Sequence, residues 1–205
     1  NAMASLQFGE YYKRIPLKKS ATIVQGNALR IEWQSLIDPM PWEKEEPRYH
    51  YILGNPPFIG YAWQSKEQKE DLELIFDGVD SAGVLDYVTA WYIKSAKYLK
   101  EFQVTESQLP RTIVAFVSTN SISQGEQVGI LWNELLNIYK IKIHFAHRTF
   151  KWSNEARGNA AVHVVIIGFS NFDINAKRIV EYEDIRDEPH EVEAKNINPY
   201  LVNSK

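Results

Sequence analysis

The hydrophobic residues of this chain fall into short continuous runs, separated by longer stretches of mixed character. Such runs, bounded by glycine, proline or polar residues, predict β-strands. They lie at 21–24, 49–53, 112–117, 141–146, 161–169 and 178–182. The run at 112–117 is apolar at almost every position, which is the pattern of a strand buried on both faces, and we expect it at the centre of a sheet.

Three stretches between these runs have apolar residues at helical spacing and predict amphipathic helices. They cover 65–77, 84–100 and 126–139. The first begins with Ser65 and Gln68, which have the spacing of an N-terminal capping box. Its charged run at 67–73 is interpreted as a solvated helix face. Strands that alternate with helices of this length predict an α/β fold with a mainly parallel sheet, its faces covered by the three helices.

Composition narrows the class of protein. The 205 residues are 44% hydrophobic and 13% aromatic, enough to bury the core of one sizeable domain. No apolar run approaches the length of a membrane span. The absence of cysteine excludes disulfides, thiolate metal sites and a catalytic thiol, and it agrees with a cytoplasmic location. The net charge of −3 argues against binding polyanions by bulk electrostatics, so a nucleic acid would be held at a local site or by another part of the protein.

A stiff corner rich in hydrogen-bond acceptors follows the strand at 49–53. Its sequence is Asn55-Pro56-Pro57-Phe58. The prolines restrict the backbone and lack N–H donors, so the corner presents the Asn55 side-chain carbonyl and the Pro56 backbone carbonyl beside the ring of Phe58. In an open α/β sheet, ligands bind at the carboxyl ends of the strands, which is where this corner lies.

Two acceptors beside an aromatic ring suit a planar substrate that carries an NH₂ group. The nitrogen of such an amine is a poor nucleophile, because its lone pair is delocalised into the ring. Accepting both hydrogens favours a tetrahedral, attacking nitrogen and stabilises its developing positive charge by roughly 2–4 kcal/mol. Stacking on Phe58 adds about 1–3 kcal/mol. The alternative, a proline-rich turn around a buried phenylalanine, is disfavoured because the corner directly follows a strand.

The corner and its surroundings resemble the catalytic domain of amino-group DNA methyltransferases, most closely the MmeI-like type II restriction-modification enzymes. The resemblance implies a Rossmann-like, S-adenosylmethionine-dependent fold whose first strands are missing, with the strand at 161–169 antiparallel to its neighbour at 112–117. It also implies that Asn55-Pro56-Pro57-Phe58 is the motif that catalyses methylation of adenine N6. The other matching stretches are 26–29, 86–91, 116–127 and 198–201.

The resemblance further implies which residues contact the cofactor. The loop that touches the adenine ring of S-adenosylmethionine corresponds to Gly26, Asn27, Ala28 and Leu29. Asp86 is implied to lie beside the cofactor. The family more often has aspartate where this chain has Asn27, but asparagine still accepts a hydrogen bond from the adenine amine. A glycine-rich loop for the methionine end and an acidic residue for the ribose are not identifiable, so we expect an incomplete cofactor site and an inactive isolated chain.

Two histidines lie at the end of the predicted strand at 141–146, and two aromatic residues follow it. Phe150 and Trp152 would lie in a polar loop, and the resemblance implies that an aromatic here forms the second wall around a flipped adenine; we favour Phe150. An aromatic that only anchors the loop is the alternative. His144 and His147 are three residues apart, but no carboxylate cluster accompanies them, so we expect no metal site.

These assignments give a domain organisation and a set of partners. We expect a tag remnant at 1–3, a partial methyltransferase domain at 4–170, and a trailing strand and linker at 171–205 that leads to a missing recognition domain. Double-stranded DNA would bind through that domain, and an exposed sheet edge would allow self-association. Two alternatives stay open: a protein glutamine-N5 methyltransferase, which uses the same Asn-Pro-Pro corner, and a non-catalytic scaffold. A 5-methylcytosine enzyme is excluded because it needs a cysteine nucleophile.

Overall fold

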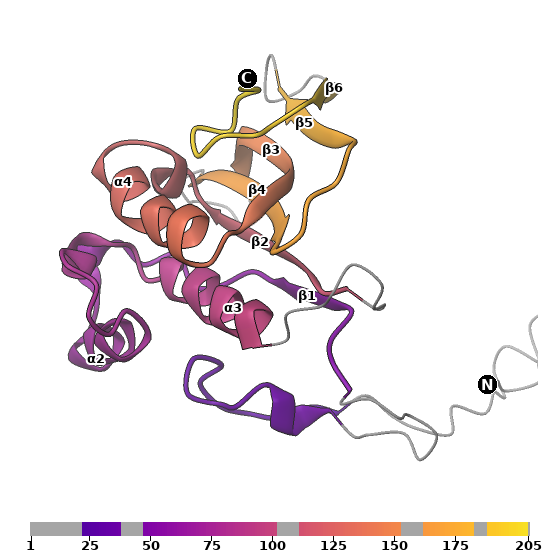
Figure 1. The fold of residues 1–205 in the computed structure, drawn as a ribbon. Helices are drawn as coiled ribbons and strands as arrows, with labels where there is room; N and C mark the ends of the chain where they lie inside the picture. Colours follow the sequence, from indigo (N-terminus) through magenta and orange to yellow (C-terminus); the bar gives the residue numbers. More distant parts are fainter. Residues whose placement is uncertain (1–21, 38–46, 102–110, 153–161, 183–187, 205) are drawn as a thin grey trace, which may run out of the picture.

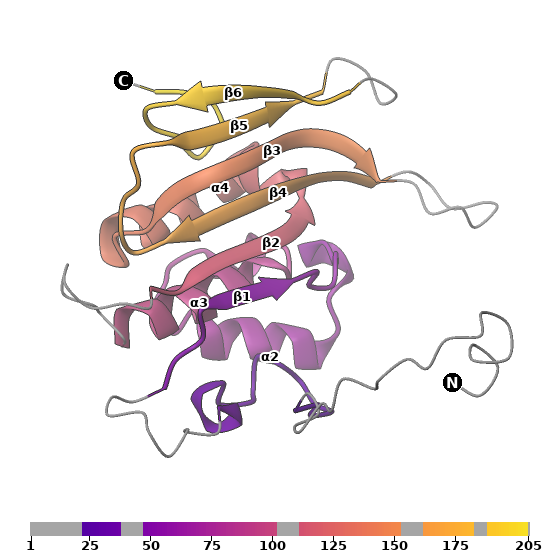
Figure 2. The ribbon, with the colours of Figure 1, turned by 90° about the vertical axis from the view of Figure 1, so that its right-hand side faces the viewer.

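The computed structural model describes residues 22–37, 47–101, 111–152, 162–182 and 188–204. Six strands form one sheet in the order β1-β2-β4-β3-β5-β6 (Figure 1 and Figure 2). They are β1 (Tyr51–Gly54), β2 (Ile113–Thr119), β3 (Lys142–Trp152), β4 (Val162–Ser170), β5 (Lys177–Glu181) and β6 (His190–Ala194). The tag remnant expected at 1–3 lies outside the described residues, so it stays a prediction.

Four of the six strands run in one direction. β1 pairs with β2, and β3 with β5, in parallel; β4 is inserted antiparallel between β2 and β3, and β6 is antiparallel to β5. The carboxyl ends of β1, β2, β3 and β5 therefore lie at the same edge of the sheet. The predicted antiparallel neighbour of β2 is confirmed, with Phe116 opposite Ile167. β2 lies inside the sheet, second from the β1 end, rather than at its centre.

Helices cover one face of the sheet. α2 (Lys66–Ile75), α3 (Thr89–Glu101) and α4 (Glu126–Asn133) all lie on the same side (Figure 1 and Figure 2). The prediction that helices cover both faces is wrong for the described residues, in which the opposite face carries none. Short 3-10 turns lie at Gln34–Leu36, Tyr61–Trp63, Ala82–Val84 and Asn120–Ser123, and a π-helical turn follows α4 at Glu134–Ile138. Within the described ranges, no helix combines the length and the apolar composition that crossing a membrane requires.

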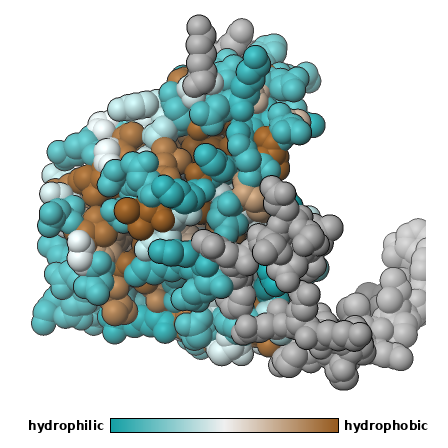
Figure 3. Space-filling view, viewed as in Figure 1, coloured by the Kyte–Doolittle hydropathy of each residue, from teal (hydrophilic) through white to brown (hydrophobic). Residues whose placement is uncertain are grey.

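The core forms where α3 packs on β2 and β4. Tyr92 of α3 is fully buried, with its ring stacked on Phe169 at 5.3 Å between centroids and edge-on to Phe116. Its hydroxyl shares a 2.7 Å hydrogen bond with the Ser118 hydroxyl, so neither buried polar group lacks a partner. Some apolar side chains remain visible between hydrophilic ones at the level of the sheet and its helices (Figure 3).

The starts of two helices show how local contacts set their boundaries. The predicted capping box of α2 is confirmed: Ser65 Oγ accepts from the Gln68 N–H, and the Gln68 side chain accepts from the Ser65 N–H. α3 begins at Thr89 rather than at residue 84. The Thr89 hydroxyl donates to the Asp86 carbonyl at 2.7 Å, and this bond closes the turn from which the helix starts.

Three predictions are wrong at places where a strand depends on its neighbours. Residues 22–24 form no strand, and Ile23 is 89% exposed; a short apolar run without a paired neighbour has no ladder to join. β3 continues to Trp152, so Phe150 and Trp152 lie on a strand instead of a loop. The segment expected to be a linker contains β6, which pairs with β5 along its whole length.

Candidate active site

The predicted catalytic corner begins where β1 ends. Gly54 is the last residue of β1, and a Cβ there would lie 3.1 Å from the ring of Phe116 on β2. Glycine is therefore favoured, because it lets the strand end close against that ring. Beyond it, Asn55 is exposed, Pro56 is buried and Phe58 is half-buried. The buried Pro56 anchors the corner, and the side chain of Asn55 is exposed to solvent.

A cavity of about 440 Å³ joins this corner to the turn at 26–29. Asn55, Pro56 and Pro57 line it from the corner, and Ala28 lines it from the turn. The other lining residues are mostly aromatic or apolar: Trp33, Tyr49, Tyr51, Ile52, Leu53, Gly54, Trp91 and Phe116. Its volume is within the range of small-molecule sites, and its lining suits a ligand with an aromatic ring. The structure brings together two segments that the sequence assigned separately to catalysis and to cofactor binding.

The turn at 26–29 is held by its own backbone and by α3. Asn27 Oδ1 accepts a 2.9 Å hydrogen bond from the Leu29 N–H, and the Asn27 carbonyl accepts one of the same length from the Arg30 N–H. Lys94 of α3 donates to the Leu29 carbonyl at 2.8 Å. Leu29 is 2% exposed, whereas Asn27 lies at the surface. The leucine anchors the turn while the asparagine stays accessible.

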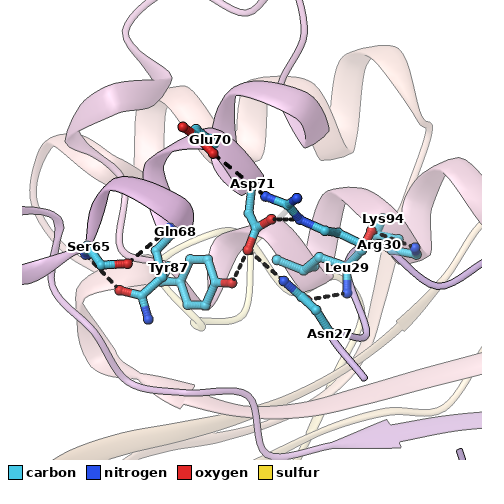
Figure 4. A network of polar contacts seen from close by, with 9 residues as sticks. All are labelled: Asn27, Leu29, Arg30, Ser65, Gln68, Glu70, Asp71, Tyr87 and Lys94. Atoms are coloured by element: carbon cyan, nitrogen blue, oxygen red, sulfur yellow. Dashed lines mark hydrogen bonds and ion pairs between the residues drawn. The ribbon is translucent and has the colours of Figure 1, made fainter. Parts of the chain in front are cut away.

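Asp71 of α2, which is 2% exposed, holds this turn from a second side (Figure 4). Its Oδ2 accepts hydrogen bonds from Asn27 Nδ2 at 2.7 Å and from the Tyr87 hydroxyl at 2.5 Å. Its Oδ1 accepts from Arg30 Nε at 2.6 Å. Burial raises the pKa of Asp71, but the three hydrogen bonds together outweigh burial and leave the pKa below its ordinary value of 3.8. The pKa of the Tyr87 hydroxyl is raised, mainly by burial and secondly by the carboxylate of Asp71.

Asp86 is a second buried carboxylate, 7% exposed, and it connects the loops that follow β1 and β2. Its Oδ2 accepts a 2.5 Å hydrogen bond from the Ser121 hydroxyl, and its Oδ1 accepts one of 3.3 Å from the Tyr61 N–H. Its backbone N–H donates to the side chain of Gln127 on α4 at 3.0 Å. The side chain predicted to lie beside the cofactor is thus engaged by the protein itself, and it holds two loops of the carboxyl edge together.

Phe150 lies near the carboxyl end of β3, opposite Val164 of β4. Its ring packs against that of Tyr182, with 5.0 Å between centroids. β2 and β4 separate β1 from β3, so at about 4.8 Å per strand β3 lies roughly 14 Å across the sheet from β1. The structure places Phe150 at the same edge of the sheet as the corner, across two strands. Trp152 ends β3, and its side chain lies outside the described part of the chain, as do residues 153–161.

The two histidines of β3 make separate contacts. His144 is 3% exposed, its Nε2 lies 2.8 Å from the Phe172 carbonyl, and burial lowers its pKa. His147 Nδ1 lies 2.7 Å from the Tyr182 hydroxyl, and burial lowers its pKa as well. In the part of the chain that the structure describes, no three His, Asp or Glu side chains gather as metal ligands would.

Sequence reasoning misses two features of this site. Asp71 belongs to the charged run at 67–73, and its interpretation as a solvated face is wrong at this position. Asp71 is four residues before the buried Ile75 and so shares its helix face, a spacing that would have identified it. Tyr61 and Trp63, which follow the corner, are 47% and 86% exposed. Two aromatics close together in a polar stretch also precede the charged run at 67–73, and their spacing near the corner could have identified them as exposed.

Comparisons with known proteins agree with this arrangement. A family model described as the MmeI DNA-methyltransferase domain matches residues 1–181. DNA methyltransferase A of Bacillus subtilis (strain 168) is 40% identical over 191 residues, which are 93% of this chain and 20% of that protein. The structure of the Type IIL restriction-modification enzyme MmeI in complex with DNA is 48% identical, with a TM-score of 0.80, and the match covers 100% of this chain and 25% of that chain. The chain spans a quarter or less of the length of these relatives, and it belongs to the family of MmeI DNA-methyltransferase domains.

Proposed function

We propose that this chain is part of a site-specific DNA methyltransferase of the restriction-modification type, which transfers a methyl group from S-adenosylmethionine to N6 of a flipped adenine. Membership of the family supports methyl transfer, and the relative solved in complex with DNA supports DNA as the partner. The observation that carries the proposal is the cavity that Asn55 and Ala28 line together. Transfer of a methyl group from a bound cofactor to a bound base requires the two binding sites to be next to each other, as the turn and the corner are here.

The residues around the cavity fit the adenine end of the cofactor. Aromatic side chains among the lining residues offer faces for a purine ring. Asn27 Oδ1, which accepts one hydrogen bond from Leu29, keeps a second lone pair for an amine donor. Asn27 and Ala28 would hold this end of S-adenosylmethionine, which supplies an electrophilic methyl group when bound.

The catalytic corner would act on the amine of the target base. Asn55 Oδ1 and the Pro56 carbonyl accept its two hydrogens, which draws the nitrogen lone pair out of conjugation with the ring. When bound, S-adenosylmethionine would supply the methyl group and its sulfur would keep the bonding pair, so positive charge would develop on the base nitrogen. The two acceptors stabilise that charge by roughly 2–4 kcal/mol. The surplus proton leaves to solvent, because neither Asn55 nor Phe58 is a base.

The walls of the base pocket are assigned from the same edge of the sheet. Phe58 would stack on one face of the adenine, and we assign the opposite face to Phe150, which lies at the carboxyl edge with its ring supported by Tyr182. Trp152, two residues further along β3, is the alternative. A base that is extruded from the duplex needs two such faces to replace its lost stacking.

Further partners are proposed from charge and from the sheet edge. A net charge of −3 supplies little attraction for DNA, so the duplex would be held mainly by parts of the protein beyond this chain. β1 is the end strand of the described sheet. This edge is our candidate for self-association. The cysteine-free composition supports a cytoplasmic location.

Methyl transfer by the full-length protein tests the proposed function. The protein is incubated with tritium-labelled S-adenosylmethionine and duplex DNA of mixed sequence, and the nucleosides are separated after digestion. We expect the label in N6-methyladenine. Label in N4-methylcytosine would refute the choice of base, and label in a glutamine of an added protein would favour the protein methyltransferase instead.

A further inference from the structure

Asn27 and Asp71 form a pair that connects the turn at 26–29 to α2, across 44 residues of sequence. Asn27 Nδ2 donates to Asp71 Oδ2 at 2.7 Å (Figure 4). An aspartate at position 27 would put a second carboxylate in the place of this amide, where two like charges repel strongly. The amide of Asn27 can donate a hydrogen bond to the Asp71 carboxylate, which a carboxylate at position 27 could not do.

The hydrogen bond between them is not needed to satisfy either side chain. Arg30 Nε at 2.6 Å and the Tyr87 hydroxyl at 2.5 Å already donate to the two oxygens of Asp71. Asn27 lies at the surface, so its amide would otherwise be solvated. The effect of the bond is to position Asn27, whose Oδ1 is held on its other side by the Leu29 N–H.

We propose that Asp71 is a positioning residue for the cofactor: it holds Asn27 so that Oδ1 can accept a hydrogen bond from the adenine amine, and its charge is the reason that position 27 carries an amide. The inference rests on the proposed function and adds a residue from α2 to it. Asp71 acts through Asn27 and needs no contact with the cofactor. In the double variant Asn27→Asp with Asp71→Asn, position 71 would carry the amide donor and position 27 the carboxylate acceptor, so the hydrogen bond between them could form again.

The test compares four forms of the full-length protein: wild type, Asn27→Asp, Asp71→Asn and the double exchange. kcat, KM for S-adenosylmethionine and the unfolding temperature are measured for each across a range of pH. We expect each single change to raise KM by about tenfold, the effect of one lost charge-assisted hydrogen bond. kcat should change little, because this contact is made equally before and during the reaction.

Two further readouts separate this role from a general loss of stability. The double exchange should restore KM to within about threefold of wild type, since the two changes act on one interaction. The KM of Asn27→Asp should fall as the pH is lowered, because a proton shared by the two carboxylates relieves their repulsion. Glu70→Gln is the matched control: Glu70 precedes Asp71 on α2, is 48% exposed and lies 3.9 Å from Arg30, and its change should leave KM unaltered.

The results that would contradict the pairing differ from those that would contradict the proposed function. The role of Asp71 is overturned if the fold-increase in KM of the double exchange equals the product of the fold-increases of the two single variants. It is also overturned if the KM of Asn27→Asp does not depend on pH. If the wild-type protein binds no S-adenosylmethionine, it is the proposed function that fails. The pairing is then decided by the unfolding temperatures, which must recover in the double exchange if Asn27 and Asp71 depend on each other.

Discussion

The backbone N–H of Tyr87 donates a 2.9 Å hydrogen bond to the carbonyl of Ile59, one residue beyond the proposed catalytic corner. The hydroxyl of the same tyrosine donates to Asp71, which in turn holds Asn27. One residue at the approach to α3 therefore connects the corner after β1 with the turn at 26–29. The two sides of the cavity are positioned by a common element.

Replacing Asn55 tests the catalytic corner. Asn55→Ala removes one of the two acceptors for the target amine, so the rate of methyl transfer should fall by a hundredfold or more, corresponding to about 3 kcal/mol. Cofactor affinity should change little, which single-turnover kinetics and equilibrium binding can separate. Lys66→Ala, at a side chain that is 92% exposed, is the control. A near-normal single-turnover rate in Asn55→Ala would refute the assignment.

Replacing Phe150 tests the second wall of the base pocket. If its ring covers the flipped base, Phe150→Ala should reduce the fluorescence enhancement of 2-aminopurine placed at the target position, because the analogue then stacks back into the duplex. Tyr182→Phe is the matched control, since it keeps the ring that packs on Phe150 and removes only the hydroxyl that contacts His147. An undiminished signal in Phe150→Ala would leave the wall to Trp152 or to neither residue.

Acid unfolding should report on the carboxylate of Asp71. Its pKa in the folded protein lies below 3.8, so it contributes stability above that pH and loses it as the pH falls through the folded value. Tyr87→Phe removes one of its three donors, which raises the folded pKa and should move acid unfolding to higher pH. Arg30 and Glu70 are the other charged groups nearby, and Glu70→Gln serves as the control. Circular dichroism follows the transition, and an unchanged midpoint in Tyr87→Phe would contradict this account.

The hydroxyl pair in the core predicts a coupled effect on stability. Tyr92→Phe leaves the buried Ser118 hydroxyl without its 2.7 Å partner and should cost about 1–3 kcal/mol of unfolding free energy. Ser118→Ala should have a similar effect, and the double variant should cost less than the sum, because no buried polar group is then left alone. Urea unfolding measures all three. Strict additivity would show that the two hydroxyls do not depend on each other.

Local patterns in the sequence predict most of the elements correctly. The capping box at Ser65 identifies the start of α2, because it needs only groups three residues apart. The apolar run behind Ile113 identifies β2, but the expectation that this strand is buried on both faces is wrong: its residues are alternately buried and half-buried, because helices cover only one face of the described sheet. The corner at Asn55 is equally local, because prolines restrict the residues beside them.

Short-range patterns thus predict most of the helices and strands and a candidate catalytic corner, whereas contacts between distant segments decide where residues without such a pattern lie. β6 carries His190, Glu191 and Glu193 and has little apolar signal; it forms because β5 offers a hydrogen-bonding edge. Asp71 is buried only because Arg30, 41 residues away, and Tyr87, 16 residues away, supply donors. Propensities and caps act within a turn or two of the chain, while pairing partners and the burial of charge depend on contacts between segments that only folding brings together.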